Sequence, residues 1–532
     1  MWDLIDAWAE REQDEAARAL VREHIRRFAF TRRSKNRRIN SQTRDRARHA
    51  HTRLTPHDVV VRHQWLFASQ WLQESVAEME DGELDYRKRE DAVRNARVEA
   101  LQEIWTEKGF AGIQALAAIS GTPMTIGWHL ADGVIDEAGS ASFLTRCLAL
   151  DDPTLVSKMD ELVAGFVRKV TPELRLDTTR TLSGTLPPDQ ICRLLKVSPF
   201  ERDSWLLVHS QDAPIREQYW RDVHPGWLHP GSPDLNEAID RLLEARRPRA
   251  AFQAVHAAFE NVETSRLKRL LDQVGTCDLE PAGTYQLDPY YISSALSILD
   301  GRPGVTRDEM ARLEFLLIRA LDHSEHGIPN LERQLVESPR LFVQVLALTF
   351  KRNDDGQDPP EWRIQNSEQR EAVWSAAYTL LDKIRRVPGT DDDGTIRAAD
   401  LKAWVTEARS LCLEHGRAEI GDQKIGQILA AAPVGDDGIW PCAAVREVLE
   451  DVASPEIAIG MGVAVYNSRG VHYRSEGGAD ERALASKYRT WSRQLAFEYP
   501  HVANLVEQIA ARYDHEADRE DSDAAVRRRL RH

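Results

Sequence analysis

Residues 389–400 have the spacing of oxygen-bearing side chains that is typical of a calcium-binding loop. Asp391 and Asp393 would supply carboxylate ligands, and the glycine that follows them would take the sharp turn. The first ligand position, however, is Gly389, and the last is Asp400, where a bidentate glutamate is expected. Because one carboxylate is missing and another is shortened, the sequence favours a polar turn that caps the next helix over a calcium site.

A cluster of His323, Glu325 and His326 follows an apolar helix and is a second candidate for chemistry, because transition metals bind imidazole. The zinc-binding HExxH motif places two histidines four residues apart on one helical face. These two histidines lie three residues apart at an expected helix end. The sequence therefore predicts a helix cap or a surface cluster, and no metal.

Motifs of the well-known enzyme classes are absent from the sequence. There is no GxSxG nucleophile elbow, and none of the five cysteines has a catalytic family signature around it. There is no phosphate-binding GxxxxGK[ST] loop, and Gly460-Met461-Gly462 lacks the third glycine of a dinucleotide-binding turn. We therefore expect no cofactor, and an enzyme with an unfamiliar active site stays as an alternative.

The most unusual charge pattern lies in residues 22–62, which contain 13 Lys and Arg against three acidic residues. This segment has a net charge of +10, whereas the whole chain is at −15 and the remainder therefore at −25. Arginines close to Phe28 and Phe30 suit phosphate contact and base stacking. The candidate contacts to a nucleic acid or to a partner protein are Arg32, Arg33, Arg37, Arg38, Arg44 and Arg48.

A structural role for the same segment is the favoured interpretation. Residues 43–53 have helix-compatible spacing, and a tryptophan-containing helix is expected at residues 59–76. In a chain that is otherwise strongly acidic, the arginines would form internal salt bridges. Contact with nucleic acid and docking on an acidic protein surface stay open as alternatives.

The elements that must position these residues are helical almost everywhere. Large apolar residues recur at helical spacing, for example in residues 235–243, and Lys108-Gly109 predicts a helix end. Tight turns with proline separate successive helices, so the sequence predicts an all-α fold built as an irregular array of helix pairs, similar to an α-solenoid of the HEAT or TPR kind. No fixed repeat period occurs. One short β-hairpin is expected at residues 463–473.

Four regions are expected along the chain. Residues 1–90 form an N-terminal helical region that contains the basic segment, and residues 91–350 form the helical array. Residues 351–450 are helical with polar loops, of which 351–358 is one, and residues 451–532 form a helical end with a charged, fraying tail.

The composition favours a cytoplasmic protein without a membrane segment. No run of about 18 uncharged apolar residues occurs, and the N-terminus lacks the pattern of a signal peptide. The five cysteines lie far apart, which is typical of reduced thiols and not of a disulfide framework.

Residues 28–34, 54–58 and 464–471 resemble parts of large uncharacterised bacterial proteins. The chain is also similar in general appearance to the helical-repeat arms of STAND-type ATPases and other bacterial antiphage conflict proteins. The ATPase module is absent, so the resemblance carries over no catalytic residue. It implies a context in a bacterial antiphage defence system.

The function expected from these observations is that of a non-enzymatic helical scaffold or sensor subunit that binds another protein of a larger assembly. Helical arrays offer extended concave surfaces, and the chain has arginines and tryptophans suited to such contacts. Nucleic-acid binding through residues 22–62 and an unfamiliar enzyme are the two alternatives.

Overall fold

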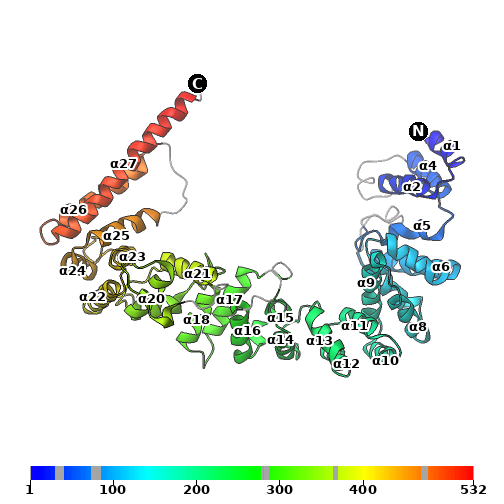
Figure 1. Cartoon of the computed structure of the whole chain (residues 1–532). Helices are drawn as coiled ribbons and strands as arrows, with labels where there is room; N and C mark the ends of the chain where they lie inside the picture. The colour runs from blue at the N-terminus through cyan, green and yellow to red at the C-terminus, as the bar shows by residue number, and fades with distance from the viewer. Residues whose placement is uncertain are drawn as a thin grey trace. The chain divides into compact units, whose positions relative to one another are not determined.

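The computed structural model describes residues 2–29, 41–72, 86–276, 280, 285, 287–363, 370–468 and 477–530 (Figure 1). Within these residues the chain forms 26 α-helices and three short 3-10 helices, and no β-sheet is present. The predicted all-α helical array is confirmed. The nearest approach to a strand in the described residues is an isolated bridge between Thr390 and Ile396.

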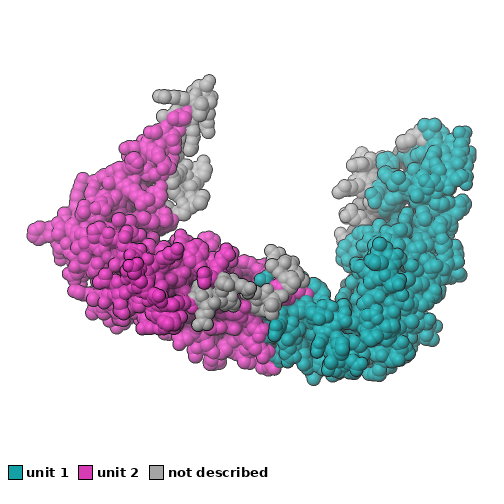
Figure 2. All heavy atoms as spheres, in the orientation of Figure 1, with its two compact units in different colours: residues 1–257 teal, residues 258–532 magenta. Residues whose placement is uncertain are grey.

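The chain divides into two compact units, residues 1–257 and residues 258–532, which Figure 2 shows in different colours. The helices of unit 1 are α1 (Trp2–Ala9), α2 (Glu15–Ala29), α4 (Ser41–Arg53), α5 (Val59–His63), α6 (Tyr86–Ile119), α7 (Pro123–Gly133), α8 (Glu137–Leu148), α9 (Pro153–Lys169), α10 (Pro172–Ser183), α11 (Pro188–Val197), α12 (Arg202–His209), α13 (Ala213–Asp222), α14 (Leu235–Glu244) and α15 (Pro248–Val255), with the 3-10 helix η1 (Gln64–Phe67).

Unit 2 is also built from successive α-helices. Its helices are α16 (Thr264–Thr276), α17 (Pro289–Asp300), α18 (Arg307–Leu317), α19 (Pro329–Glu337), α20 (Pro339–Thr349), α21 (Arg370–Lys383), α22 (Ala398–Glu414), α23 (Ala418–Leu429), α24 (Ala443–Val452), α25 (Pro455–Asn467), α26 (Ala479–Leu495) and α27 (Pro500–Leu530), with the 3-10 helices η3 (Phe259–Asn261) and η4 (Pro360–Trp362). The last two α-helices lie side by side as a helical hairpin (Figure 1).

The many short helices have clear start signals in the sequence. Proline occupies the first position of many of them, where its fixed φ suits the helix and its missing amide costs nothing. A preceding Asp, Thr or Ser then accepts a hydrogen bond from a backbone amide of the first turn. Such caps are Asp152 before α9, Thr171 before α10, Asp288 before α17, Ser338 before α20 and Ser454 before α25.

Two of the closest helix pairs cross at reciprocal glycines. In unit 1, a Cβ added to Gly127 of α7 would lie 1.8 Å from the carbonyl oxygen of Leu162 in α9, and one added to Gly165 of α9 would lie 1.9 Å from that of Met124 in α7. In unit 2 the same arrangement joins α23 and α25 through Gly426 and Gly460. Only glycine permits the two backbones to approach this closely.

The predicted hairpin at residues 463–473 is wrong, because residues 463–466 belong to helix α25. Ile457, Met461 and Val465 are all buried, and their spacing of four residues matches one face of a helix. This face packs in the core of unit 2, and its burial outweighs the strand preference of the β-branched residues. The second predicted strand, residues 471–473, lies outside the described residues.

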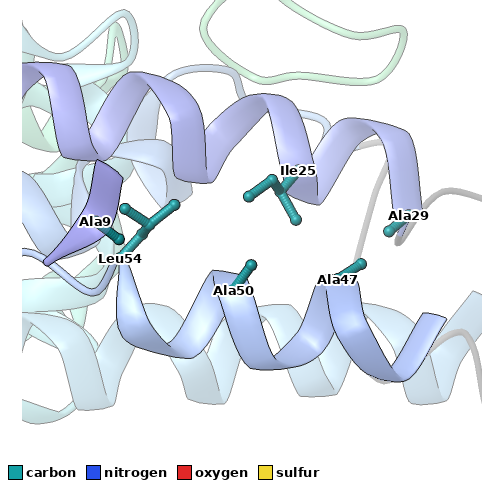
Figure 3. Packing of buried hydrophobic residues seen from close by; sticks show 6 residues of the cluster. All are labelled: Ala9, Ile25, Ala29, Ala47, Ala50 and Leu54. Atoms are coloured by element: carbon teal, nitrogen blue, oxygen red, sulfur yellow. The ribbon is translucent and has the colours of Figure 1, made fainter. Parts of the chain in front are cut away.

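A small core holds the N-terminal helices together and orients the basic segment. Figure 3 shows Ala47 and Ala50 of α4 facing Ile25 and Ala29 of α2, with Leu54 at the end of α4. All of these side chains are buried. Because alanine is small, α2 and α4 pack closely, and Arg18 and Arg22 of α2 donate hydrogen bonds to the backbone carbonyls of Arg53 and His51 in α4.

Among the described residues, no helix has the length and apolar character needed to cross a membrane.

Candidate functional site

The six arginines proposed as contacts divide into two groups. Arg32, Arg33, Arg37 and Arg38 lie outside the described residues. Arg44 and Arg48 belong to α4, four residues and therefore about one turn apart, and Arg48 is half-buried. The structure thus leaves the proposed contact role of all six as a prediction.

Other arginines of the basic segment form the internal ion pairs that the sequence favours. Their partners are acids of neighbouring helices in unit 1 or of the same helix. The pairs are Arg26 and Arg27 with Glu23, Arg46 with Asp3, Arg53 with Asp6 and Glu10, and Arg62 with Glu103. The pairs of Arg46 and Arg53 join α4 to α1 and the turn after it, the pair of Arg62 joins α5 to α6, and the pairs of Glu23 lie within α2.

A cavity of about 180 Å³ lies beside the same arginines, and Trp65 forms part of its wall. Arg22 donates hydrogen bonds to the carbonyl oxygens of His51 and Arg62, and it forms no ion pair within the part of the chain that the structure describes. Burial, together with the positive charges of Arg22 and Arg26, lowers the pKa of His51 to about 4. The imidazole is therefore neutral near pH 7, and the cavity is electropositive.

Residues 389–400, whose spacing resembles a calcium-binding loop, form a polar turn in the structure. Asp391 and Asp400 both contact the guanidinium of Arg397, at 3.0 and 2.9 Å, and Asp393 accepts a hydrogen bond from the backbone of Thr395. Gly394 takes the left-handed turn with φ +88°. Among the described residues, no group of three or more His, Cys, Asp or Glu side chains is placed to hold a metal ion. The prediction that the segment caps α22 is wrong in detail, since the residue before this helix, Arg397, makes no side-chain cap.

The structure separates the histidine cluster. The side chain of His323 is 95% exposed, and Glu325 is exposed as well. The imidazole of His326 instead turns inward and contacts Glu314 of α18 at 3.1 Å. The predicted surface position is therefore confirmed for His323 and Glu325 and wrong for His326.

The described cysteines are poor candidates for nucleophiles. Cys147, Cys192 and Cys412 are buried, and Cys442 is half-buried. Burial raises the pKa of Cys412 to about 12, so its thiol stays protonated and unreactive near neutral pH.

A groove in unit 2 was not predicted from the sequence. It has a volume of about 890 Å³ and runs along the end of α20, residues 350–363 and the start of α21. Its apolar lining includes Leu348, Phe350 and Trp374. Lys351 and Arg370 lie on its rim.

A fixed aromatic pair borders this groove. The indole Nε1 of Trp374 donates a hydrogen bond to the carbonyl oxygen of Thr349 at 3.3 Å, which sets the orientation of the ring. Tyr378, one turn later on α21, stacks against Trp374 with ring centres 5.5 Å apart. The two residues are 45% and 46% exposed. They form an ordered aromatic surface that is open to solvent, which is typical of contact sites.

The wall of the groove is anchored by a buried arginine. Arg417 is 1% exposed, and its guanidinium donates to both carboxylate oxygens of Asp358 at 2.7 Å. It also donates to the carbonyl oxygens of Phe350 and His415. The hydrogen bond from Arg417 holds the pKa of Asp358 below its usual value. Residues 350–358 are thereby fixed to the turn between α22 and α23.

The groove has an excess of positive charge. Arg352 is neutralised by Asp354, whose pKa it lowers to about 2, and Arg417 is neutralised by Asp358. Lys351 and Arg370 form no ion pair within the described part of the chain. The one acidic side chain of the lining besides Asp358 is Glu371. This arrangement suits a ligand that combines negative charge with an apolar or aromatic group.

Two sequence signals could have indicated this groove. Trp374 and Tyr378 lie four residues apart, so on a helix they share one face. The polar break at residues 351–358 marks a connection that is longer than a simple turn. Neither signal shows that these segments meet.

Comparison of the chain with models of protein families, with curated proteins and with solved structures finds no match.

Proposed function

We propose that this chain is a helical scaffold whose groove beside α20 and α21 binds an acidic segment of another protein. The observation that carries the proposal is the fixed, half-exposed Trp374–Tyr378 pair next to the positive charges of Lys351 and Arg370. Ordered aromatic residues dominate the binding energy of many protein interfaces, and complementary charge sets orientation and association rate.

A protein partner fits the groove better than a nucleic acid does. Leu348 and Phe350 supply an apolar surface that an aliphatic or aromatic side chain would cover. The chain as a whole has a net charge of −15, which would repel a long polyanion outside the groove. A short acidic segment with one apolar anchor meets both conditions. The place of such a complex in a bacterial antiphage system stays a prediction.

Trp374→Ala is expected to weaken binding of such a segment by about 2 kcal/mol, or roughly 30-fold, because truncation of a central aromatic contact has effects of this size. The probes are fluorescent synthetic peptides that combine several Asp or Glu residues with one Leu, Phe or Trp. Fluorescence anisotropy of the full chain with the peptide panel measures the dissociation constants. A matched panel in which Lys replaces the acids should bind weakly.

Charge-reversal variants test how much Lys351 and Arg370 contribute to peptide binding. Lys351→Glu combined with Arg370→Glu should reduce acidic-peptide binding at least about tenfold and flatten its dependence on salt. Arg493→Glu, which reverses an exposed charge on α26, should leave binding unchanged. Equal affinity of the wild type and the groove variants would contradict the proposal, as would a preference for the lysine panel.

Nucleic-acid binding through residues 22–62 is a second candidate function, which the electropositive cavity beside Arg22 favours. If the six candidate arginines contact phosphates of duplex DNA, the affinity should fall with salt with a log–log slope of roughly −5. Replacing Arg32 and Arg33 with glutamine should flatten this slope and leave the melting temperature unchanged. Gel-shift titrations over a range of salt measure it, and an absent or salt-independent shift excludes this function.

A further inference from the structure

Three polar side chains in unit 2 form a chain of contacts apart from the groove and the basic segment. Ser297 lies on α17, Glu314 on α18, and His326 in the connection before α19. The hydroxyl oxygen of Ser297 lies 3.3 Å from Nδ1 of His326, and Nε2 of His326 lies 3.1 Å from Oε1 of Glu314. The three residues thus make a continuous hydroxyl–imidazole–carboxylate relay.

The carboxylate end of this relay is rigidly held. Glu314 is fully buried. Its Oε2 accepts a hydrogen bond from the backbone amide of Leu331 at 2.7 Å, and its Oε1 accepts one from the side-chain amide of Asn330 at 2.9 Å. Asn330 and Leu331 both belong to the first turn of α19. The free backbone amides at a helix N-terminus stabilise a nearby negative charge. Glu314 therefore has a fixed position from which it can orient the imidazole.

The hydrogen bonds determine which imidazole nitrogen carries the proton. A carboxylate only accepts hydrogen bonds, so Nε2 of His326 must donate to Glu314. In the neutral imidazole Nδ1 is then an acceptor, and the Ser297 hydroxyl must donate to it. The imidazole side chain is 5% exposed, and the backbone amide of His326 donates to the hydroxyl of Ser293 at 3.1 Å. The base is thus fixed, while Ser297 is exposed to solvent.

We propose that Ser297 is an activated nucleophile that attacks activated carboxylic or phosphonic esters, with His326 as its general base and Glu314 as the residue that positions the base. This arrangement meets the requirement for nucleophilic catalysis, in which a base lies within hydrogen-bonding distance of the hydroxyl and a third group orients the base. Compared with the familiar serine–histidine–aspartate arrangement, the imidazole is turned end for end, and its two nitrogens exchange roles.

The reaction is balanced without any further reagent. The Ser297 oxygen forms a bond to the acyl carbon, its proton passes to Nδ1 of His326, and the bond from the acyl carbon to the leaving oxygen breaks. The proton then moves from His326 to the departing oxygen, which leaves as an alcohol or phenol. Water, activated by His326 in the same way, hydrolyses the acyl-serine and restores the hydroxyl.

A fluorophosphonate probe tests the nucleophile directly. Ser297 forms the bond to phosphorus, the P–F bond breaks, fluoride leaves, and the serine proton passes to His326. We expect one adduct on the full chain, assigned to Ser297 by tandem mass spectrometry, and no adduct in Ser297→Ala. Labelling of Ser294→Ala, a variant on the same helix, should equal that of the wild type. His326→Gln should label at least about 100-fold more slowly, because general-base assistance has effects of this size.

A second variant keeps the proposal testable if His326→Gln fails to fold. Ser297→Cys places a thiol against the same imidazole, and it should react with iodoacetamide at least about tenfold faster than Ser486→Cys. Ser486 is exposed on α26 beside Lys487, which would itself favour a reactive thiolate, so the comparison is conservative. Absence of a Ser297 adduct, or equal rates for the two cysteine variants, would overturn the proposal.

The outcome is independent of the proposed scaffold function. Ser297→Ala should bind the acidic peptides as the wild type does, because Ser297 lies outside the groove lining. Trp374→Ala should still be labelled at Ser297. Loss of one activity therefore identifies which proposal has failed.

Discussion

Replacing Gly460 with alanine is expected to destabilise unit 2 by about 3 kcal/mol, the upper end of the range for overpacked cores. The new methyl group would lie 1.9 Å from the carbonyl oxygen and 2.7 Å from the carbonyl carbon of Gln423 in α23. These are backbone atoms and cannot rotate away, so α23 and α25 would have to separate. Urea unfolding followed by circular dichroism measures the change in the free energy of unfolding.

The same helix provides the matched control. A Cβ added to Gly462 meets no atom within 4 Å. Gly462→Ala should therefore stabilise the unit by up to about 1 kcal/mol, because alanine is the better helix former. Equal stabilities for the two alanine variants would show that α23 and α25 do not cross at Gly460. Gly127→Ala should reproduce the large loss in unit 1, where the crossing has the same geometry.

Arg417→Met is expected to cost about 3 kcal/mol, because it removes the buried partner of an ion pair and leaves Asp358 with only the 3.6 Å contact to Arg352. Asp358 and the carbonyl oxygens of Phe350 and His415 would all lose their donor. Methionine fills much of the arginine volume, so the loss measures hydrogen bonds and charge more than packing. Urea unfolding at pH 7 tests the value. Arg493→Met, at an exposed position of α26, is the control and should stay within about 0.5 kcal/mol of the wild type.

The contribution of the Arg417–Asp358 ion pair to the free energy of unfolding should depend on pH. The pKa of Asp358 is lowered in the folded chain, so its stabilisation is fully present above the value of about 3.9 in the unfolded chain and is lost as the pH falls through the folded value. The difference in stability between the wild type and Arg417→Met should therefore be constant from pH 7 to about pH 5 and shrink below about pH 4. A difference that grows in acid would contradict the assignment of the ion pair.

Arg417→Met also separates the structural from the functional role of the groove wall. Residues 350–358 would no longer be fixed to the turn between α22 and α23, although Trp374 and Lys351 would remain. We expect weaker acidic-peptide binding in this variant at a temperature where it is still folded. Peptide affinity equal to that of the wild type would show that the wall is dispensable.

The local elements of this protein could be predicted from the sequence because their signals are local. The all-α fold follows from apolar spacing, proline at helix starts and capping side chains, which act within one or two turns. The helix end at Gly109 was predicted in this way, and the residue has φ +59° in the structure. Where a local signal was ambiguous, as in residues 463–466, burial of one helical face decided the outcome.

The sites, in contrast, depend on contacts between residues that are far apart in the chain. Arg417 meets Asp358 across 59 residues, and Ser297 meets His326 across 29. No short motif marks such pairs, so the sequence identified His326 only as part of a surface cluster. In the sequence, Gly460 looked like part of an incomplete dinucleotide-binding turn. In the structure it allows the close approach of α25 to α23. The sequence by itself determined the all-α class and the starts of many helices, because backbone hydrogen bonding and capping are short-range, whereas residues 463–466 of α25 were mistaken for a strand. Only the tertiary structure decided which side chains meet and which are buried, because burial and pairing depend on how the helices pack.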